Sequence, residues 1–432
     1  MTTDTGSGGA GPGLETEPAG GAGTGPVVTP SWRGGFGRLW SAAVLSRFGD
    51  ALRGAALPLL AVRLTDDPLL VSLVTACGYL PWLLFGLVGG AVADRVDQRR
   101  AMWAVDVARA VLMAAFAVAV VADRAAIVLL LVLAFALTTL QTLFDNAATA
   151  LLPTVVPGPA LSSANARLMT GQQLAASFAA APLVPVVLAL NAGAPYLLNA
   201  LTYLVAALLV ASLRAPVSRP SRPGGRTLRR DIAEGVGALW RDRVLRSLCL
   251  GDALASVGMG ALIAMLVVHV TDWLAAGESG YAAVLTAYGA GSVAGGLVAG
   301  RVTRWLGQAR ALVLLMVGQI GCLLVLGSVR HLAAAVVALG IFGVAGMIWN
   351  VTEVTMMQQR SPAGMLGRVS AASRTLSAGS APLGAVLGGL AAGLWGPHTP
   401  VLLTAALFLA AVPVLIPALR APDTGTAPPA GP

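Results

Sequence analysis

Lysine is absent from the chain, because all 28 basic residues among its 432 residues are arginines. A nucleotide-binding loop of the Gly-x-x-x-x-Gly-Lys type is therefore excluded. Charged residues make up only 11% of the chain, whereas soluble domains carry about a quarter. The three cysteines (Cys77, Cys249 and Cys322) lie far apart in apolar runs and are expected to be small buried side chains. We expect no metal, no cofactor and no enzymatic site.

Apolar residues are abundant: they form 56% of the chain, and the mean hydropathy is +0.79. A helix needs about 20 apolar residues to cross a hydrocarbon core ~30 Å thick. Twelve runs of this kind predict an all-α membrane protein with twelve transmembrane helices. The expected runs are 38–63, 69–93, 101–122, 126–146, 166–190, 195–213, 246–270, 281–300, 309–328, 332–353, 369–393 and 398–418.

The arginines predict the orientation in the membrane. Of the 28, 21 fall in segments on one side of the predicted spans, three on the other side and four within spans. Short loops rich in arginine stay in the cytoplasm. We therefore expect a multi-pass protein of the cell membrane, with both termini cytoplasmic. The net charge of +9 indicates topology and not nucleic-acid binding.

Composition divides the chain into five segments. Residues 1–36 and 419–432 are predicted to be disordered tails, since they are polar and rich in glycine and proline. A linker at 214–245, rich in proline, glycine and arginine, separates a six-helix half at 37–213 from another at 246–418. Residues 228–243 are expected to form an amphipathic helix on the membrane surface. Residues 153–165 are expected to form a short interfacial segment.

The two halves share sequence at a nearly constant spacing. Four pairs of segments match at shifts of 200 to 206 residues: Gly49-Asp50 with Gly251-Asp252, Gly89-Gly90 with Gly295-Gly296, Asp145 with Asn350, and Ala181-Pro182 with Ala381-Pro382. Six spans in each half give both repeats the same orientation. This pattern predicts parallel repeats related by an axis normal to the membrane.

A loop signature, G-x-x-x-D-R-x-x-x-R, lies between the second and third runs as Gly90, Asp94, Arg95 and Arg99. With it, the chain resembles the major facilitator superfamily over residues 37–418. Further segments resemble the proton-driven drug-efflux branch that includes macrolide and enterobactin exporters: Gly49-Asp50, Leu64-Thr65 with Pro68, Arg99-Arg100, Phe144-Asp145, and Leu151-Leu152-Pro153 with Val156-Pro157. The chain departs from the family pattern at Asp97, where the signature has glycine. A second departure is in the antiporter motif, which is normally rich in glycine and is represented here only by Ala181-Pro182.

The charged loop is the predicted conformational gate. Gly90 allows a close helix contact, and Asp94 accepts bonds from a helix N-terminus or an arginine. Arg95, Arg99 and Arg100 can hold the two halves together on the cytoplasmic face. The alternative is that these charges only fix the topology. The second half keeps Arg301 but has Gly300 at the position of the acid, which favours a gating role for Asp94.

Acidic residues within spans are the candidate proton sites, because charges there are costly and usually face a water-filled cavity. Burial favours the neutral form of Asp50, whereas Arg47 and Arg53 on the same helical face favour its carboxylate. Asp252 and Glu353 have no arginine within one turn of their own helix and are preferred for coupling. Asp145 is a fourth candidate. It is expected, like Glu353, near the cytoplasmic mouth.

Two other features are expected to support these acids. Asp106 and Arg109 are read as a structural ion pair beside the cytoplasmic loop, and Arg374 as a partner for Asp145 or Glu353. Polar and aromatic residues within spans are candidates for the substrate cavity: Trp82, Gln141, Phe144, Gln172, Gln173, Asn199, Tyr203 and Trp349. The histidines at 269, 331 and 398 are expected to be exposed at the outer edge.

The sequence therefore predicts a secondary transporter. The resemblance implies export of a hydrophobic or amphipathic small molecule, such as a drug, antibiotic or siderophore-like compound, by proton antiport and alternating access. Its expected partners are the substrate, protons and the lipid bilayer, without nucleic acid, and the chain is expected to be a monomer. The alternatives are a lipid or metabolite carrier and a transport-inactive scaffold or sensor.

Overall fold

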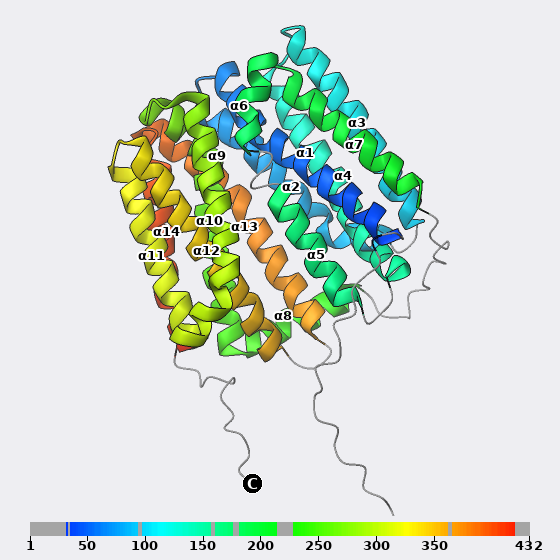
Figure 1. Cartoon of the computed structure of the whole chain (residues 1–432). Helices are drawn as coiled ribbons and strands as arrows, with labels where there is room; N and C mark the ends of the chain where they lie inside the picture. The colour runs from blue at the N-terminus through cyan, green and yellow to red at the C-terminus, as the bar shows by residue number, and fades with distance from the viewer. Residues whose placement is uncertain are drawn as a thin grey trace, which may run out of the picture.

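The computed structural model describes residue 32 and residues 35–93, 97–156, 160–175, 181–213, 228–361 and 365–419. Every long regular element in these ranges is a helix (Figure 1). The first half comprises α1 (Gly35–Leu64), α2 (Pro68–Ala93), α3 (Gln98–Val121), α4 (Ile127–Val155), α5 (Leu161–Leu174), α6 (Ala181–Leu190) and α7 (Ala194–Ala211).

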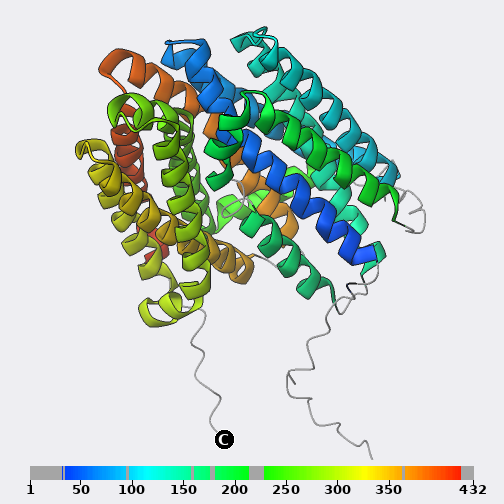
Figure 2. The same ribbon diagram turned by 45° about the horizontal axis from the view of Figure 1, so that its top comes forward.

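The second half follows α8 (Leu228–Arg241). It comprises α9 (Arg243–Val268), a π-helical turn η3 (His269–Trp273), α10 (Gly277–Leu306), α11 (Gln308–Ser328), α12 (Leu332–Arg360), α13 (Leu366–Trp395), α14 (Thr399–Val414) and the short α15 (Ile416–Leu419). The long helices run alternately up and down between two ends of the molecule (Figures 1 and 2). We call the end where α1 begins and α8 lies the α8 end, and the other the far end.

Capping side chains and glycines set several helix limits. The Asp97 side chain accepts a bond from the Arg100 N–H and begins α3, and Asp242 accepts from Val244 and Leu245 and begins α9. Gly307 has a φ of 76° between α10 and α11, a conformation that glycine adopts without strain. At these short segments one helix ends and the next begins within a few residues.

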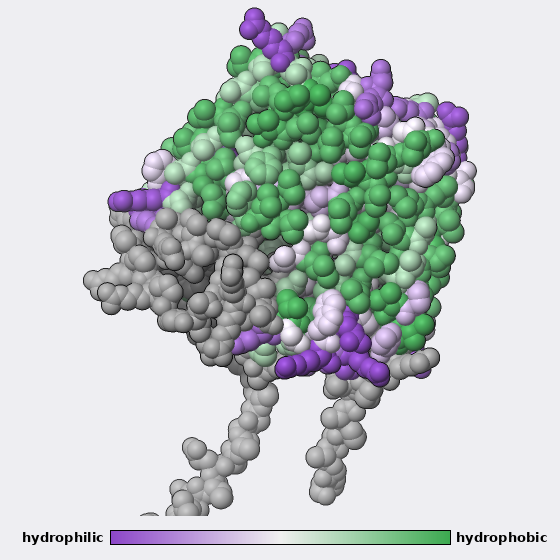
Figure 3. Space-filling view, turned by 180° about the vertical axis from the view of Figure 1, so that it is seen from behind, coloured by the Kyte–Doolittle hydropathy of each residue, from purple (hydrophilic) through white to green (hydrophobic). Residues whose placement is uncertain are grey.

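Nine helices in the described part of the chain are long and apolar enough to cross a membrane. Three predicted spans have features that explain why they are not among them. α1 carries Arg47, Asp50 and Arg53 near its middle, α5 and α6 are separate short helices, and α14 has only 16 residues. Figure 3 shows hydrophobic side chains across the middle of one face, with hydrophilic ones gathered toward its edges. The predicted class, an all-α membrane protein, is confirmed.

Some predicted boundaries are wrong. The run predicted at 126–146 continues as α4 to Val155, because Ala147, Leu151 and Leu152 keep burying one face of the helix. The interfacial segment predicted at 153–165 instead contains the end of α4 and the start of α5. The helix predicted at 228–243 is present as α8, and its Leu239 packs with Leu245 and Cys249 of α9. The limits of the two halves and the tails stay a prediction.

Packing within the second half is close at α9 and α13. A Cβ added at Gly260 of α9 would meet the carbonyl oxygen of Ala381, and one at Gly384 of α13 would meet that of Val257. Only glycine permits this approach of two backbones. In the first half the main contacts are α1 with α7, α3 with α7, and α2 with α4. Both halves contribute to one large apolar core.

The halves contact each other mainly through α2 with α13, α2 with α9, and α6 with α10. Several of these contacts lie at the far end. Arg63, in the last turn of α1, forms an ion pair with Glu278, in the first turn of α10. A Cβ at Gly389 of α13 would overlap the Ser72 side chain near the start of α2. The two halves are therefore in direct contact at the far end.

Candidate functional site

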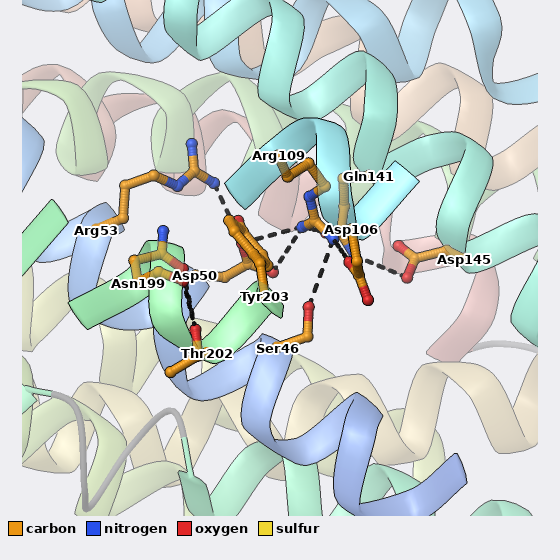
Figure 4. Close-up of polar contacts among 10 residues, drawn as sticks. All are labelled: Ser46, Asp50, Arg53, Asp106, Arg109, Gln141, Asp145, Asn199, Thr202 and Tyr203. Carbon is orange, nitrogen blue, oxygen red and sulfur yellow. Dashed lines mark hydrogen bonds and ion pairs between the residues drawn. The ribbon is translucent and has the colours of Figure 1, made fainter. Parts of the chain in front are cut away.

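A buried polar network in the first half is centred on Arg109 of α3, which has no exposed surface (Figure 4). Its Nη1 donates to Asp106 Oδ1 at 2.9 Å and to Ser46 Oγ at 3.4 Å. Its Nη2 donates to both oxygens of Asp50, at 3.2 and 3.3 Å, and to Gln141 Oε1. One guanidinium thus joins side chains from α1, α3 and α4.

Aromatic rings flank the Arg109 guanidinium. Its carbon lies 4.1 Å from the centroid of the Tyr203 ring on α7 and 5.7 Å from that of Phe144 on α4. The Tyr203 hydroxyl donates to Asp50 Oδ1, and Arg53 Nη2 lies 3.5 Å from the same oxygen. Cation–π contacts strengthen when water is excluded. The rings therefore help to hold a charge that would be costly in the bilayer interior.

Gln141 extends the network toward Asp145. Its Nε2 donates to Asp145 Oδ1 at 2.8 Å while its Oε1 accepts from Arg109 (Figure 4). Asp145 is half-buried and lies ten residues before the end of α4, so the expectation that it sits near the mouth of the protein is wrong. The i, i+4 spacing of Gln141 and Asp145 places both on one face of α4.

The predicted surroundings of Asp50 need correction. Arg53 does pair with Asp50, but its closer cation is Arg109, from a different helix. Arg47 is exposed and forms no ion pair among the described residues. The Asp106–Arg109 pair is present, but it does not support the neighbouring loop: Arg109 instead reaches the interior of the first half.

The second half contains a smaller acidic site. Asp252 of α9 accepts a hydrogen bond from Ser377 of α13 through Oδ2 and is half-buried. Glu353 of α12 is 5% exposed, its helix contacts α9, and its negative charge is repelled by that of Asp252. Neither acid forms an ion pair among the described residues. The side chain of the predicted partner Arg374 lies outside the described residues.

Most of the predicted cavity residues are not on an open surface. Phe144, Asn199, Tyr203 and Trp349 are buried, because they pack between helices of their own half. They are packed in this conformation, and their assignment to a cavity lining stays a prediction. Gln141 and Gln172 are half-buried, and Trp82 is exposed. The side chain of Gln173 lies outside the described residues.

The predicted gate is only partly described. Asp94 and Arg95 lie outside the described residues, and Gly90 belongs to α2. Arg99 Nη2 donates to the Ala211 carbonyl of α7, and Arg100 pairs with Asp97 at 3.6 Å. In this conformation Arg99 joins two helices of the first half and does not bridge the halves.

The expectation that all three histidines are exposed is wrong for His269. It is fully buried on η3, its ring lies 4.8 Å from that of Trp273, and Trp273 stacks on His398 at 5.8 Å. His398 is half-buried, and His331 is exposed and caps α12. The sequence reasoning missed the burial of His269, since the π-helical turn changes which residues face inward.

Reasoning from sequence also missed Ser46, Ser377, Arg63 and Glu278. Ser46 and Ser377 each lie one turn from a charged residue on the same helix, which was an available signal. The contact of Arg63 with Glu278 had no signal in the sequence, because the two residues are 215 positions apart and meet only through the arrangement of the halves.

Comparison with known structures finds the same fold in several membrane transporters. A mutant form of the nucleoside transporter NupG matches with a TM-score of 0.72 at 10% identity, covering 89% of this chain and 100% of that one. A bacterial homologue of the iron transporter ferroportin, in its inward-facing state, gives 0.70 at 15% identity, covering 88% and 98%. A bacterial homologue of the human lysosomal transporter Spinster, inward-facing and occupied, gives 0.68 at 13% identity, covering 89% and 96%. No curated protein sequence matches.

The fold and its apolar helices therefore define a multi-pass membrane protein. Residues 39–385 match the model of the Major Facilitator Superfamily, and the chain belongs to this family. It is a transporter and not an enzyme.

Proposed function

We propose that this protein exports a hydrophobic or amphipathic small molecule in exchange for protons. The observation that carries the proposal is the Asp252–Glu353 pair in the second half. The two acids lie on contacting helices, Glu353 is buried and Asp252 half-buried, and neither has an ion pair among the described residues. A proton bound by either one relieves their repulsion.

Proton binding at this pair changes the charge of the site by one unit. The Ser377 hydroxyl donates to Asp252 and stabilises its ionised form, whereas Glu353 has no hydrogen bond from a described residue. Because the negative charges of the two acids repel, we assign the proton to the pair and not to one residue. This arrangement suits a group that takes up and releases a proton in each transport cycle.

Alternating access requires that one end closes while the other opens. The contacts of Arg63 with Glu278 and of Ser72 with Gly389 support a state closed at the far end. The arginine-rich segments support a cytoplasmic location for the α8 end. Together these two inferences support an inward-facing state, with both termini proposed to be cytoplasmic.

The substrate class rests on the drug-efflux resemblance around Asp50 and Asp145. By their names, the similar structures are a nucleoside transporter and bacterial homologues of an iron transporter and of a lysosomal transporter, so the fold leaves the cargo open. The low content of charged residues favours a substrate with a large apolar part. We further propose that the protein acts as a monomer in the cell membrane, with Asp94 and its neighbouring arginines as the gate on the cytoplasmic face.

The test uses purified protein in liposomes, with ethidium as the transported probe and a pH-sensitive dye for protons. Asp252→Asn and Glu353→Gln are expected to abolish ethidium movement driven by a proton gradient, while exchange of ethidium down its own gradient continues. Asp272→Asn, an exposed acid on η3, is the matched control and keeps both activities.

Gradient-driven movement that survives in both variants would contradict the assignment of the proton to this pair. If wild-type protein moves ethidium in neither mode, the lipid or metabolite carrier or the inactive scaffold becomes the better reading.

A further inference from the structure

The first half contains three acids around Arg109, and they differ in how well their charges are stabilised. Asp50 is the best stabilised. It receives bonds from Arg109 and Tyr203 and has Arg53 at 3.5 Å. Two cations and a phenol thus stabilise one carboxylate, which offsets the cost of its burial.

Asp145 is stabilised in another way. Gln141 donates to it at 2.8 Å, and the exposed Arg47 lies within electrostatic range. Its side chain also keeps partial access to solvent. Burial still disfavours this carboxylate, and the bond from Gln141, the nearby Arg47 and partial contact with solvent offset part of that cost.

Asp106 has neither kind of stabilisation. It has no exposed surface, and its hydrogen bonds among the described residues consist of one bond, from Arg109 Nη1 to Oδ1. Among the described residues, the buried Oδ2 of Asp106 has no hydrogen-bond donor, and the buried Nε of Arg109 has no acceptor. A buried polar atom without a partner costs about 1–3 kcal/mol, and more if it carries charge.

The charges facing Asp106 do not make up for this. Arg109 on its own helix is its single ion-pair partner among the described residues, and this cation is shared with Asp50 of α1. Asp50 and Asp145 of α4 both repel a negative charge at Asp106. Arg53 lies against Asp50, on α1, and the Tyr203 hydroxyl of α7 also donates to Asp50.

We infer that Asp106 is a second proton-binding site of this transporter, and that it is protonated in the conformation described here. Arg109 then acts as the permanent counterion of Asp50, and the Asp106 carboxyl accepts from Arg109 Nη1 as a neutral group. An ionised Asp106 competes with Asp50 for the Arg109 guanidinium, which lies 2.9 Å from Asp106 Oδ1 and 3.2 Å from Asp50 Oδ1. The site therefore links a proton in the first half to the packing of α1 against α3.

This inference deepens the proposed function, because it adds a proton to the same transport cycle. Its tests do not require transport, so it stands or fails independently of ethidium export.

The first test compares two matched variants of acids that contact the same guanidinium, Asp106→Asn and Asp50→Asn. An amide is a close replacement for a neutral carboxyl but not for a carboxylate. Asp106→Asn is expected to shift the melting temperature in detergent by less than about 2 °C, and Asp50→Asn to lower it by on the order of 6–10 °C. Equal losses in both variants would overturn the inference, since they would show that both acids are ionised partners of Arg109.

The second test is infrared spectroscopy of the purified protein at neutral pH. A protonated carboxyl has its own carbonyl stretch, and hydrogen–deuterium exchange shifts it. The measurement uses a background with Asp252→Asn and Glu353→Gln, which removes the two acids of the proposed coupling pair in the second half. We expect this band in that background and its loss when Asp106→Asn is added. Absence of the band in the background variant, or its persistence with Asp106→Asn, would refute the assignment.

Discussion

The ion pair between Arg63 and Glu278 is expected to bias the protein toward the state closed at the far end. It joins α1 of the first half to α10 of the second, and its side chains are 54% and 32% exposed. An exposed pair of this kind contributes about 0.2–1 kcal/mol. Removing it by Arg63→Gln should therefore raise the ratio of open to closed molecules at that end by roughly 1.4- to 5-fold.

The measurement is the distance between spin labels at two exposed loop positions of the far end, Asp66→Cys in the first half and Asp272→Cys in the second. Arg63→Glu places two acids opposite each other and should open the far end further than Arg63→Gln. The double variant Arg63→Glu with Glu278→Arg should return the distance distribution to that of the wild type. Salt at about 1 M should reduce all of these differences, because it screens exposed charges.

A wild-type distance distribution in Arg63→Glu would refute the reasoning, since it would show that the pair has no influence on closure. If the double variant Arg63→Glu with Glu278→Arg does not restore the wild-type distance distribution, the effect of Arg63→Glu comes from packing and not from charge.

Four further predictions follow from other contacts. Gly389→Val should hold the far end open in the same spin-label measurement, by roughly 5-fold or more, because the added side chain meets α2. Asp97→Ala should lower stability by about 0.5–2 kcal/mol, seen as a lower melting temperature, because α3 loses its cap. Asp94→Asn should express normally but slow ethidium export strongly; unchanged export would leave Asp94 as a topological marker. Reporter fusions after residues 98, 225 and 306 should report cytoplasm and those near 67 and 276 the outside, and an outside signal at 225 would contradict the topology.

Local spacing made part of this structure predictable from sequence. Apolar runs of sufficient length predicted the helices. The i, i+3 spacing of Asp106 and Arg109 also predicted their ion pair, since neighbours one turn apart on a helix meet. The repeated Gly-Asp segment predicted equivalent acids in α1 and α9, at Asp50 and Asp252.

Contacts between distant helices could not be predicted in this way. Tyr203 donates to Asp50 across 153 residues, and Arg109 reaches Asp50 across 59. Both contacts depend on how the helices rotate about their axes, which a single sequence does not specify. The same rotation turns Arg47 to an exposed position and leaves Asp106 with one bonded oxygen, so the acid predicted to be a structural partner became a candidate proton site.

The close backbone contact between α9 and α13 has a mechanical consequence. Gly260 and Gly384 leave no layer of side chains between these helices at their contacts, so one cannot slide past the other without overlap. α13 has 30 residues and is therefore ~45 Å long, and it also lies along α2 of the other half. If it pivots near its far end, a tilt of about 10° moves its α8 end by roughly 8 Å, enough to admit or block a small molecule. The glycines thus make α9 and α13 move together, so that a small rotation near the far end produces a wide opening at the α8 end.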